Sequence, residues 1–359
     1  MNSERLKERV YYLDVIRVFA LFCVVTIHVS ATFWAPYKDE IDSVEWGICN
    51  FFDGFAHIGV PLFVMLSGAV TLGRGYTIKK CLSKILHYCI VLLVFSSIYT
   101  AVKYLRAGSF PGKARIIQDI LTGDSAVHLW YLYMVIGLYA AIPFLDAIIE
   151  KPKLIDFFII LFMIFAVIEP FLSVVLTNIS FKYADALKTV LERIISKMKF
   201  FFPLGYLGMS LIGYRLRYRK FSLNMRLLIY ILGVMSLFLI VAGTKYISLK
   251  TESRNLVLED NFSLPIVILS VSTFVFIRSV FEKRKISVQI VHHIAGGSFG
   301  IYLMHLFFIW ILGDFRQELY SMFPHMILLI ISFSVLIILL CFVLVLLLKK
   351  IPLIKIIIT

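Results

Sequence analysis

The chain has 359 residues, of which 60% are hydrophobic, and its mean hydropathy is +0.92. Soluble domains are about 45–50% apolar, so this composition excludes a soluble globular protein and indicates a polytopic membrane protein. The net charge is +14. Most of this charge is expected in cytoplasmic loops, where basic residues set the orientation of membrane helices, and part of it could bind a polyanionic ligand at that face.

Apolar runs long enough to cross a bilayer recur along the whole sequence, so we predict an all-α polytopic membrane protein with about ten transmembrane helices. Basic residues are enriched at the N-terminus and in every second loop, which predicts that both termini are cytoplasmic. Residues 1–350 then form one transmembrane domain and residues 351–359 a short cytoplasmic tail. The outer loops 106–127 and 177–198 are long enough for short interfacial helices. The predicted spans are residues 11–33, 51–73, 85–105, 129–149, 154–176, 199–217, 226–244, 262–281, 296–313 and 326–348.

The first predicted span contains three ionisable residues, Asp14, Arg17 and His28. Such groups are costly inside a bilayer and are usually functional or paired. Arg17 and His28 are separated by about three helical turns, so they lie on nearly one face with a rise of about 16 Å between them. Asp14 can form an i, i+3 ion pair with Arg17, which would lower the cost of placing the arginine at the inner membrane interface. His28 suits general-base catalysis, and the alternative is a packed histidine bonded to a neighbouring helix.

The second span is interrupted by small residues, including Ser67, and is followed by basic ones. Small residues allow helices, or a ligand, to approach the backbone closely. The basic group is either an ordinary cytoplasmic loop or a phosphate clamp beside the inner end of the first helix. Its members are Arg74, Lys79, Lys80 and Lys84.

Three later spans carry further candidate residues. His128 and Trp130 begin the fourth span, where they are either interfacial residues or part of an outward-facing acceptor pocket. Glu169 near the outer end of the fifth span either caps a helix or orients a substrate. Tyr302 and His305 in the ninth span lie at i, i+3 on one face, where they either bond neighbouring helices or contribute to the site.

A metal site is not expected. The cysteines lie mostly in apolar segments without metal-type spacing and are typical of small core residues. The remaining histidines also have no partner at metal-type spacing in the sequence. These are His57, His87, His292, His293 and His325.

Four segments resemble the acyltransferase-3 family of membrane proteins, and they occur in the family's order. The segment YYLDVIRVFALFCVVTIHVS is similar to its opening signature, an arginine followed after ten residues by a histidine, here Arg17 and His28. The segments GVPLFVMLSG, HLWYLYMVIGLYAAIPFL and SFGIYLMHLFFIWIL resemble its patterns in the second, fourth and ninth helices. Lysines stand where the family usually has arginines after the second helix.

The resemblance implies about ten membrane helices and transfer of an acyl group, usually acetyl, from cytosolic acetyl-CoA to an acceptor hydroxyl on the outer side. It implies that His28 is the catalytic base and that Arg17 contacts the donor. We assign two further groups of residues on this basis. The donor-binding group is Arg17, Asp14, Ser67, Arg74, Lys79, Lys80, Lys84, Arg215 and Tyr302, and the acceptor or supporting group is His128, Trp130, Glu169 and His305.

The expected partners are membrane lipid, an acyl-CoA, and a cell-envelope saccharide or a small hydroxyl compound in the plasma membrane of a bacterium, with no nucleic acid. The sequence leaves open whether the protein forms a homo-oligomer. Some family members carry a cytoplasmic racemase linked to glycopeptide resistance, and the abrupt end at Thr359 fits either such a fusion or a stand-alone enzyme. The alternatives are a transporter of a small amino acid such as L-serine, which the missing internal repeat weakens, and a membrane anchor or sensor.

Overall fold

The computed structural model describes residues 10–179, 188–189, 201–282, 288–313, 315–322 and 325–358, and within these ranges all regular structure is helical. Nine helical segments in the described ranges are long and apolar enough to cross a membrane, which confirms an all-α polytopic membrane protein. The α-helices are α1 (Tyr11–Trp34), α2 (Val44–Ala56), α3 (Gly59–Thr71), α4 (Ile78–Ala107), α5 (Lys113–Thr122), α6 (Trp130–Ile148), α7 (Pro152–Phe162), α8 (Glu169–Asn178), α10 (Phe201–Tyr218), α11 (Leu223–Lys250), α12 (Leu264–Phe281), α13 (Gln289–Leu312), α14 (Phe315–Met322), α15 (Met326–Leu348) and α16 (Pro352–Ile358).

Short helices of other kinds join these segments. The 3-10 helices are η2 (Ala35–Tyr37), η3 (Val127–Leu129) and η5 (Val257–Glu259), and η4 (Met163–Ile168) is a π-helix between α7 and α8. A π-turn inside a helix often accompanies a functional site, because it displaces the helix face that follows.

The predicted spans differ from the observed helices at several of their bounds. The predicted span 51–73 begins too late, because its helix starts at Val44 and bends at His57 and Ile58 between α2 and α3. The predicted span 199–217 begins outside the described residues, and the rest of it is α10, which is helical but is not among the nine long apolar segments. Several other helices extend past their predicted bounds, as α13 does from Gln289.

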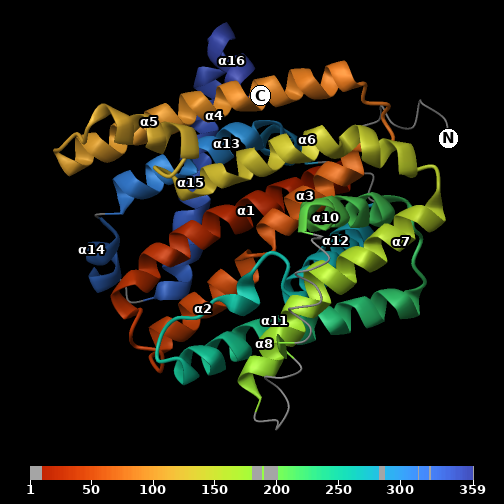
Figure 1. Cartoon of the computed structure of the whole chain (residues 1–359). Helices are drawn as coiled ribbons and strands as arrows, with labels where there is room; N and C mark the ends of the chain where they lie inside the picture. Colours follow the sequence, from red (N-terminus) through yellow and green to blue (C-terminus); the bar gives the residue numbers. More distant parts are fainter. Residues whose placement is uncertain are drawn as a thin grey trace.

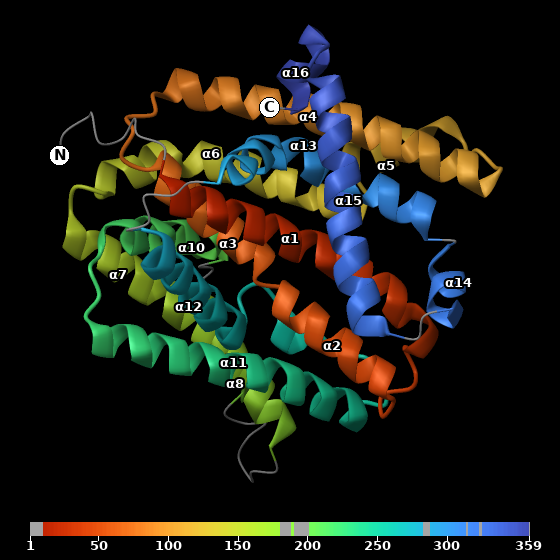
Figure 2. The same ribbon diagram turned by 180° about the vertical axis from the view of Figure 1, so that it is seen from behind.

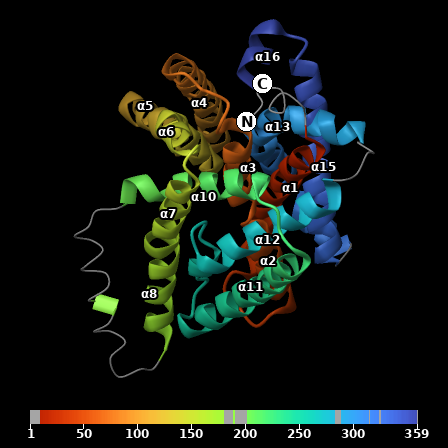
Figure 3. The ribbon, with the colours of Figure 1, turned by 90° about the vertical axis from the view of Figure 1, so that its right-hand side faces the viewer.

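Helix α1 lies inside the bundle, between α4 and α11 (Figures 1 and 2). It packs against α2, α3, α12, α13 and α15. Its C-terminal half, with Leu21, Val25 and Phe33, shares a hydrophobic core with α4, α13 and α15. Its N-terminal half, with Ile16 and Ala20, shares a second core with α3, α10 and α12. Figure 3 shows that α7 and α8 stand at the edge of the bundle.

Helices α3 and α10 approach so closely that two glycines are required. A Cβ atom on Gly68 would lie 1.9 Å from the carbonyl oxygen of Ser210, and one on Gly213 would lie 1.9 Å from that of Met65. Small residues at such contacts let membrane helices pack backbone to backbone. This confirms the expectation that the small residues of the second span allow close helix packing.

Two short helices are fixed to α4. The outer loop 106–127 contains α5, as expected, and Asp119 on α5 forms ion pairs with Lys103 at 2.8 Å and with Arg115 at 3.0 Å. Hydrogen bonds from Lys103 and Tyr104 lower the pKa of Asp119. At the other end of the chain, the expected tail contains α16, which contacts α4 and α13 and buries Ile358.

Candidate active site

Three histidines from distant parts of the chain lie together around the C-terminal half of α1. His28 is on α1, His128 is in η3, and His305 is on α13. The ring of His305 lies 5.1 Å from that of His28 and 4.9 Å from that of His128, measured between ring centres. The rings of His28 and His128 are 6.5 Å apart. The structure therefore places the predicted base beside two residues that the sequence suggested only for the acceptor or supporting side.

Backbone carbonyls fix the tautomers of two of these histidines. His305 Nδ1 lies 2.6 Å from the carbonyl of Tyr302, and His128 Nε2 lies 3.4 Å from that of Leu303. A carbonyl oxygen only accepts, so each of these nitrogens carries the proton. The other nitrogens, His305 Nε2 and His128 Nδ1, are buried and have no hydrogen-bond partner among the described residues. Two acceptor atoms are thus available in a buried site, where a substrate hydroxyl could donate to them.

Tyrosines join two elements of this histidine cluster, α13 and η3, to each other and to α4. The hydroxyl of Tyr302 donates to the carbonyl of His128, which joins α13 to η3. Tyr99 on α4 donates to the carbonyl of Leu303 at 2.8 Å, and its ring lies 5.1 Å from that of His128. These bonds fix the imidazole rings by linking backbone to side chain across three elements, as preorganised catalysis requires.

A cavity of about 200 Å³, here called the donor cavity after the predicted donor-binding residues in its wall, is lined by Arg17, Ser67 and Tyr302. Tyr302 forms the boundary between this donor cavity and the histidine cluster, because its ring also contacts those of His128 and His305. The donor cavity therefore brings together three of the predicted donor-binding residues. The other lining residues are Val24, Val60, Phe63, Leu66, Val70, Thr71, Tyr88, Tyr131, Val135, Tyr139, Ser298 and Phe299.

Asp14 holds Arg17 at the wall of the donor cavity. The guanidinium lies 3.6 Å from the Asp14 carboxylate, so the expected i, i+3 ion pair is present. The same carboxylate lies 2.6 Å from Nδ1 of His292 on α13. This partner of His292 could not be predicted from the sequence, because His292 and Asp14 are 278 positions apart. This second contact fixes Asp14 from one side and leaves Arg17 at the cavity wall.

The remaining predicted donor residues lie outside the walls of this cavity. Arg74, Lys79 and Lys80 are exposed and Lys84 is half-buried, with the Lys80 ammonium 4.1 Å from the ring centre of Tyr76. Arg215 makes two hydrogen bonds to Asp156, of 2.8 and 2.6 Å. Its guanidinium fork is therefore engaged within the protein, whereas the exposed residues are open to a ligand.

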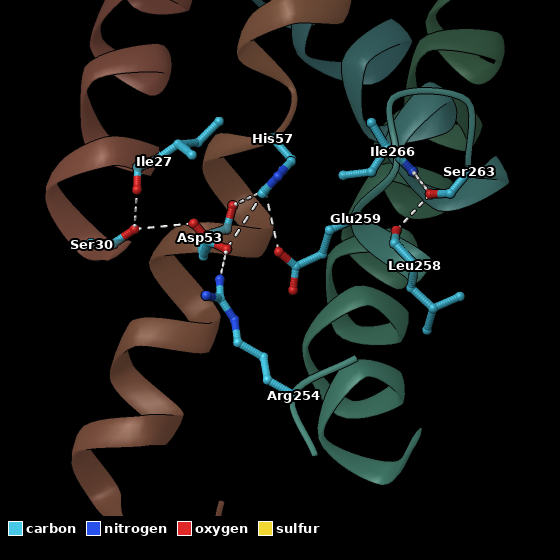
Figure 4. Close-up of polar contacts among 9 residues, drawn as sticks. All are labelled: Ile27, Ser30, Asp53, His57, Arg254, Leu258, Glu259, Ser263 and Ile266. Atoms are coloured by element: carbon cyan, nitrogen blue, oxygen red, sulfur yellow. Dashed lines mark hydrogen bonds and ion pairs between the residues drawn. The ribbon is translucent and has the colours of Figure 1, made fainter. Parts of the chain in front are cut away.

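A second polar cluster, which sequence reasoning missed, lies at the bend between α2 and α3 (Figure 4). Nδ1 of His57 lies 2.8 Å from the carbonyl of Asp53 and 3.2 Å from Oε2 of Glu259. The Asp53 carboxylate accepts from Arg254 at 2.7 Å and from Ser30 of α1 at 3.2 Å. The only sequence signal was the i, i+4 spacing of Asp53 and His57, since Glu259 comes from a remote segment.

This cluster has three side chains of the type that binds metal ions. One ligand atom from each of Asp53, His57 and Glu259 lies within 4.8 Å of the others. However, the guanidinium of Arg254 already neutralises Asp53, and Nδ1 of His57 carries a proton because it faces acceptors. The arrangement is better suited to charge pairing within the protein than to a metal ion, and the absence of a metal stays a prediction.

A larger cavity, of about 650 Å³, lies beside this second cluster. His57 and Glu259 line it, and so does Glu169, one of the predicted acceptor-side residues. Trp130 is linked to it indirectly, because its ring lies 5.9 Å from that of Tyr206, which in turn lies 4.6 Å from that of Phe262 in the cavity wall. The predicted acceptor-side residues are thus divided between this second cavity and the histidine cluster.

The family model described as an acyltransferase domain, of the acyltransferase-3 family, matches residues 10–346, nearly the whole chain. The chain belongs to the acyltransferase-3 family. It is therefore a multi-pass membrane acyltransferase, and the transporter alternative is not favoured. No curated protein and no solved structure matches the chain.

Proposed function

We propose that this acyltransferase moves an acetyl group from acetyl-CoA on the cytoplasmic side to a hydroxyl of an acceptor on the outer side, in the plasma membrane of a bacterium. The observation that carries the proposal is the donor cavity, because its wall includes both Arg17 and Tyr302, and Tyr302 contacts the histidine cluster. A cytoplasmic thioester and an external hydroxyl need such a route, because each must reach one reaction centre across the bilayer.

In this proposal the donor enters with its nucleotide at the basic face of Arg74, Lys79, Lys80 and Lys84. Arg17 contacts the phosphate end or a carbonyl of the pantetheine arm, since a guanidinium suits planar two-pronged contacts. The arm follows the donor cavity along α1. The rise of about 16 Å from Arg17 to His28 then brings the thioester to the histidine cluster.

The chemistry at the cluster requires a neutral imidazole. The acceptor oxygen forms a bond to the acyl carbon while the thioester C–S bond breaks. The hydroxyl proton passes to His28 and then to the thiolate of CoA, so charge and atoms balance. In a second route His28 first takes the acyl group and then passes it to the acceptor. His128 and His305 support either route, because each offers a buried acceptor nitrogen beside His28.

The test uses purified protein in lipid nanodiscs with acetyl-CoA and a cell-envelope glycan extract, and it follows release of free CoA. We expect His28→Ala to abolish acceptor-dependent CoA release while acetyl-CoA binding is retained. The matched control is His293→Ala, which removes an exposed histidine. Full activity of the His28→Ala protein would overturn the assignment of the base. Radiolabel that stays on the protein without acceptor would select the acyl-histidine route.

A further inference from the structure

The second cavity has the size of a small-molecule site, and its position fits an acceptor. Its volume of about 650 Å³ lies within the range of roughly 300–1,000 Å³ that is usual for ligand pockets. Its walls come from η4, α8, Gly205 of α10 and the segment 256–263, with His57 at the bend of α2 and α3. In the predicted topology these segments lie toward the outer side, opposite the donor's basic face.

The described wall of this cavity is rich in carboxylates. Three carboxylate residues, Glu169, Glu259 and Asp260, line it, and among the described residues of its wall none is a lysine or an arginine. Arg254 of the neighbouring cluster is engaged elsewhere, because its guanidinium binds Asp53 and lies 3.5 Å from the ring centre of Trp34. This cavity therefore disfavours phosphate and favours a positively charged ligand, because charges interact strongly where water is scarce.

Glu259 provides a second and independent indication of a ligand. Glu259 is only 1% exposed, yet its Oε1 atom has no hydrogen-bond partner among the described residues. A buried carboxylate oxygen without a donor is costly, so this atom favours a bound water, ion or ligand that donates to it or pairs with it. Aromatic rings of Phe165, Phe171 and Phe262 form part of the remaining wall and are suited to a cation or to the apolar face of a sugar.

We propose that this cavity binds the acyl acceptor, and that the acceptor is a hydroxyl compound carrying an ammonium group and no phosphate in the bound part. The inference rests on the proposed acyl transfer. The ammonium group donates to Glu259, and His57 lies beside it. The cavity is coupled to the catalytic helix through Asp53, which accepts a hydrogen bond from Ser30, two residues after His28 on α1.

The test measures binding of glucosamine to the purified full chain in nanodiscs by isothermal calorimetry, with N-acetylglucosamine as the neutral comparison and glucosamine 6-phosphate as the anionic one. We expect glucosamine to bind about tenfold or more tightly than either comparison sugar, as a charge-assisted hydrogen bond would give. Glu259→Gln should remove this preference, whereas Glu252→Gln, which changes an exposed glutamate outside the cavity, should keep it.

Equal binding of glucosamine and N-acetylglucosamine by the unmodified protein, or an unchanged preference in the Glu259→Gln protein, would overturn the inference. Retained acetyl-CoA binding shows that the Glu259→Gln protein is folded, and Glu169→Gln, which should weaken the preference, provides a second variant. The two proposals fail separately. Transfer to neutral sugars without an ammonium preference would overturn only the acceptor inference. Selective glucosamine binding without any acetyl transfer would overturn only the proposed function.

Discussion

The histidine cluster and the Asp53–His57–Glu259 cluster both contain a buried or half-buried imidazole, but they differ in the charge of the groups around it. In the first, each described partner of a histidine is a neutral carbonyl or ring, and no carboxylate of the described part of the chain is in contact. In the second, His57 faces two carboxylates and a guanidinium lies beyond them. An imidazole among neutral groups can accept a proton, whereas one between carboxylates is held as a donor. The comparison supports the proposals of proton transfer at the first cluster and ligand binding at the second.

The largest effect is expected within the histidine cluster itself. His28→Gln should lower kcat by about 10²–10⁴-fold, the usual contribution of a general base, without a matching change in KM. His305→Gln should lower kcat less and should shift the pH profile of kcat, because His305 acts on the reaction through its neighbours. Steady-state kinetics in nanodiscs from pH 5 to 9 measures both effects. Equal losses in the two variants, with unchanged pH profiles, would contradict the division of roles.

The donor cavity should respond differently from the histidine cluster. Arg17→Ala should raise the KM for acetyl-CoA by about tenfold or more, because a charge-assisted contact of about 1.5–3 kcal/mol is lost, while kcat changes less. Arg17→Lys should restore only part of the affinity for acetyl-CoA, because lysine keeps the positive charge but lacks the planar, bidentate geometry of the guanidinium.

Arg215→Ala is the matched control for the donor site, because the Arg215 guanidinium is already bound by Asp156. We expect it to change the KM for acetyl-CoA less than Arg17→Ala does. A larger rise in KM for Arg215→Ala would place the nucleotide at α10 rather than at the inner end of α1.

Much of the fold and part of the site could be predicted from the sequence. The spans follow from hydropathy and length, and Arg17 and His28 follow from helical spacing within one element. The bend at His57 could not be predicted, because Val44–Thr71 is one apolar segment whose break depends on packing. The approach of His128 and His305 to His28, and that of Glu259 to His57, depends on contacts between helices that are far apart in the sequence. Hydropathy carries no information on such contacts.

A smaller effect is expected at the contact between α3 and α10. This contact positions α3, which carries Ser67 in the wall of the donor cavity. Gly213→Leu would force a side chain against the carbonyl of Met65, and overpacking of this kind costs about 1–3 kcal/mol. We expect a lower Tm and a weaker acetyl-CoA affinity. The control is Gly137→Leu, because a Cβ atom on Gly137 meets nothing within 4 Å. Equal melting temperatures for the two variants would show that the close approach is not required.

The smallest effect concerns the outer side of the histidine cluster. Helix α5 leads into the segment that carries His128, and Ser125 in that segment bonds Thr100 of α4 at 2.8 Å. The hydrogen bonds from Lys103 and Tyr104 lower the pKa of Asp119, so they stabilise the docked α5 above the carboxyl's usual pKa of about 3.9. This stabilisation should be lost as the pH falls through the lowered value, because the protonated carboxyl no longer pairs with Lys103.

Hydrogen exchange of residues 113–129 should therefore increase below about pH 4, and Asp119→Asn should show the increased exchange already at pH 7. The control is Asp124→Asn, which changes a neighbouring exposed carboxylate. If Asp119→Asn increases exchange in α5 and also lowers kcat, the placement of His128 depends on this anchor. Slow exchange in the variant at pH 7 would instead mean that the hydroxyl contacts alone, such as Ser96 to Ile120 at 2.6 Å, hold α5 against α4.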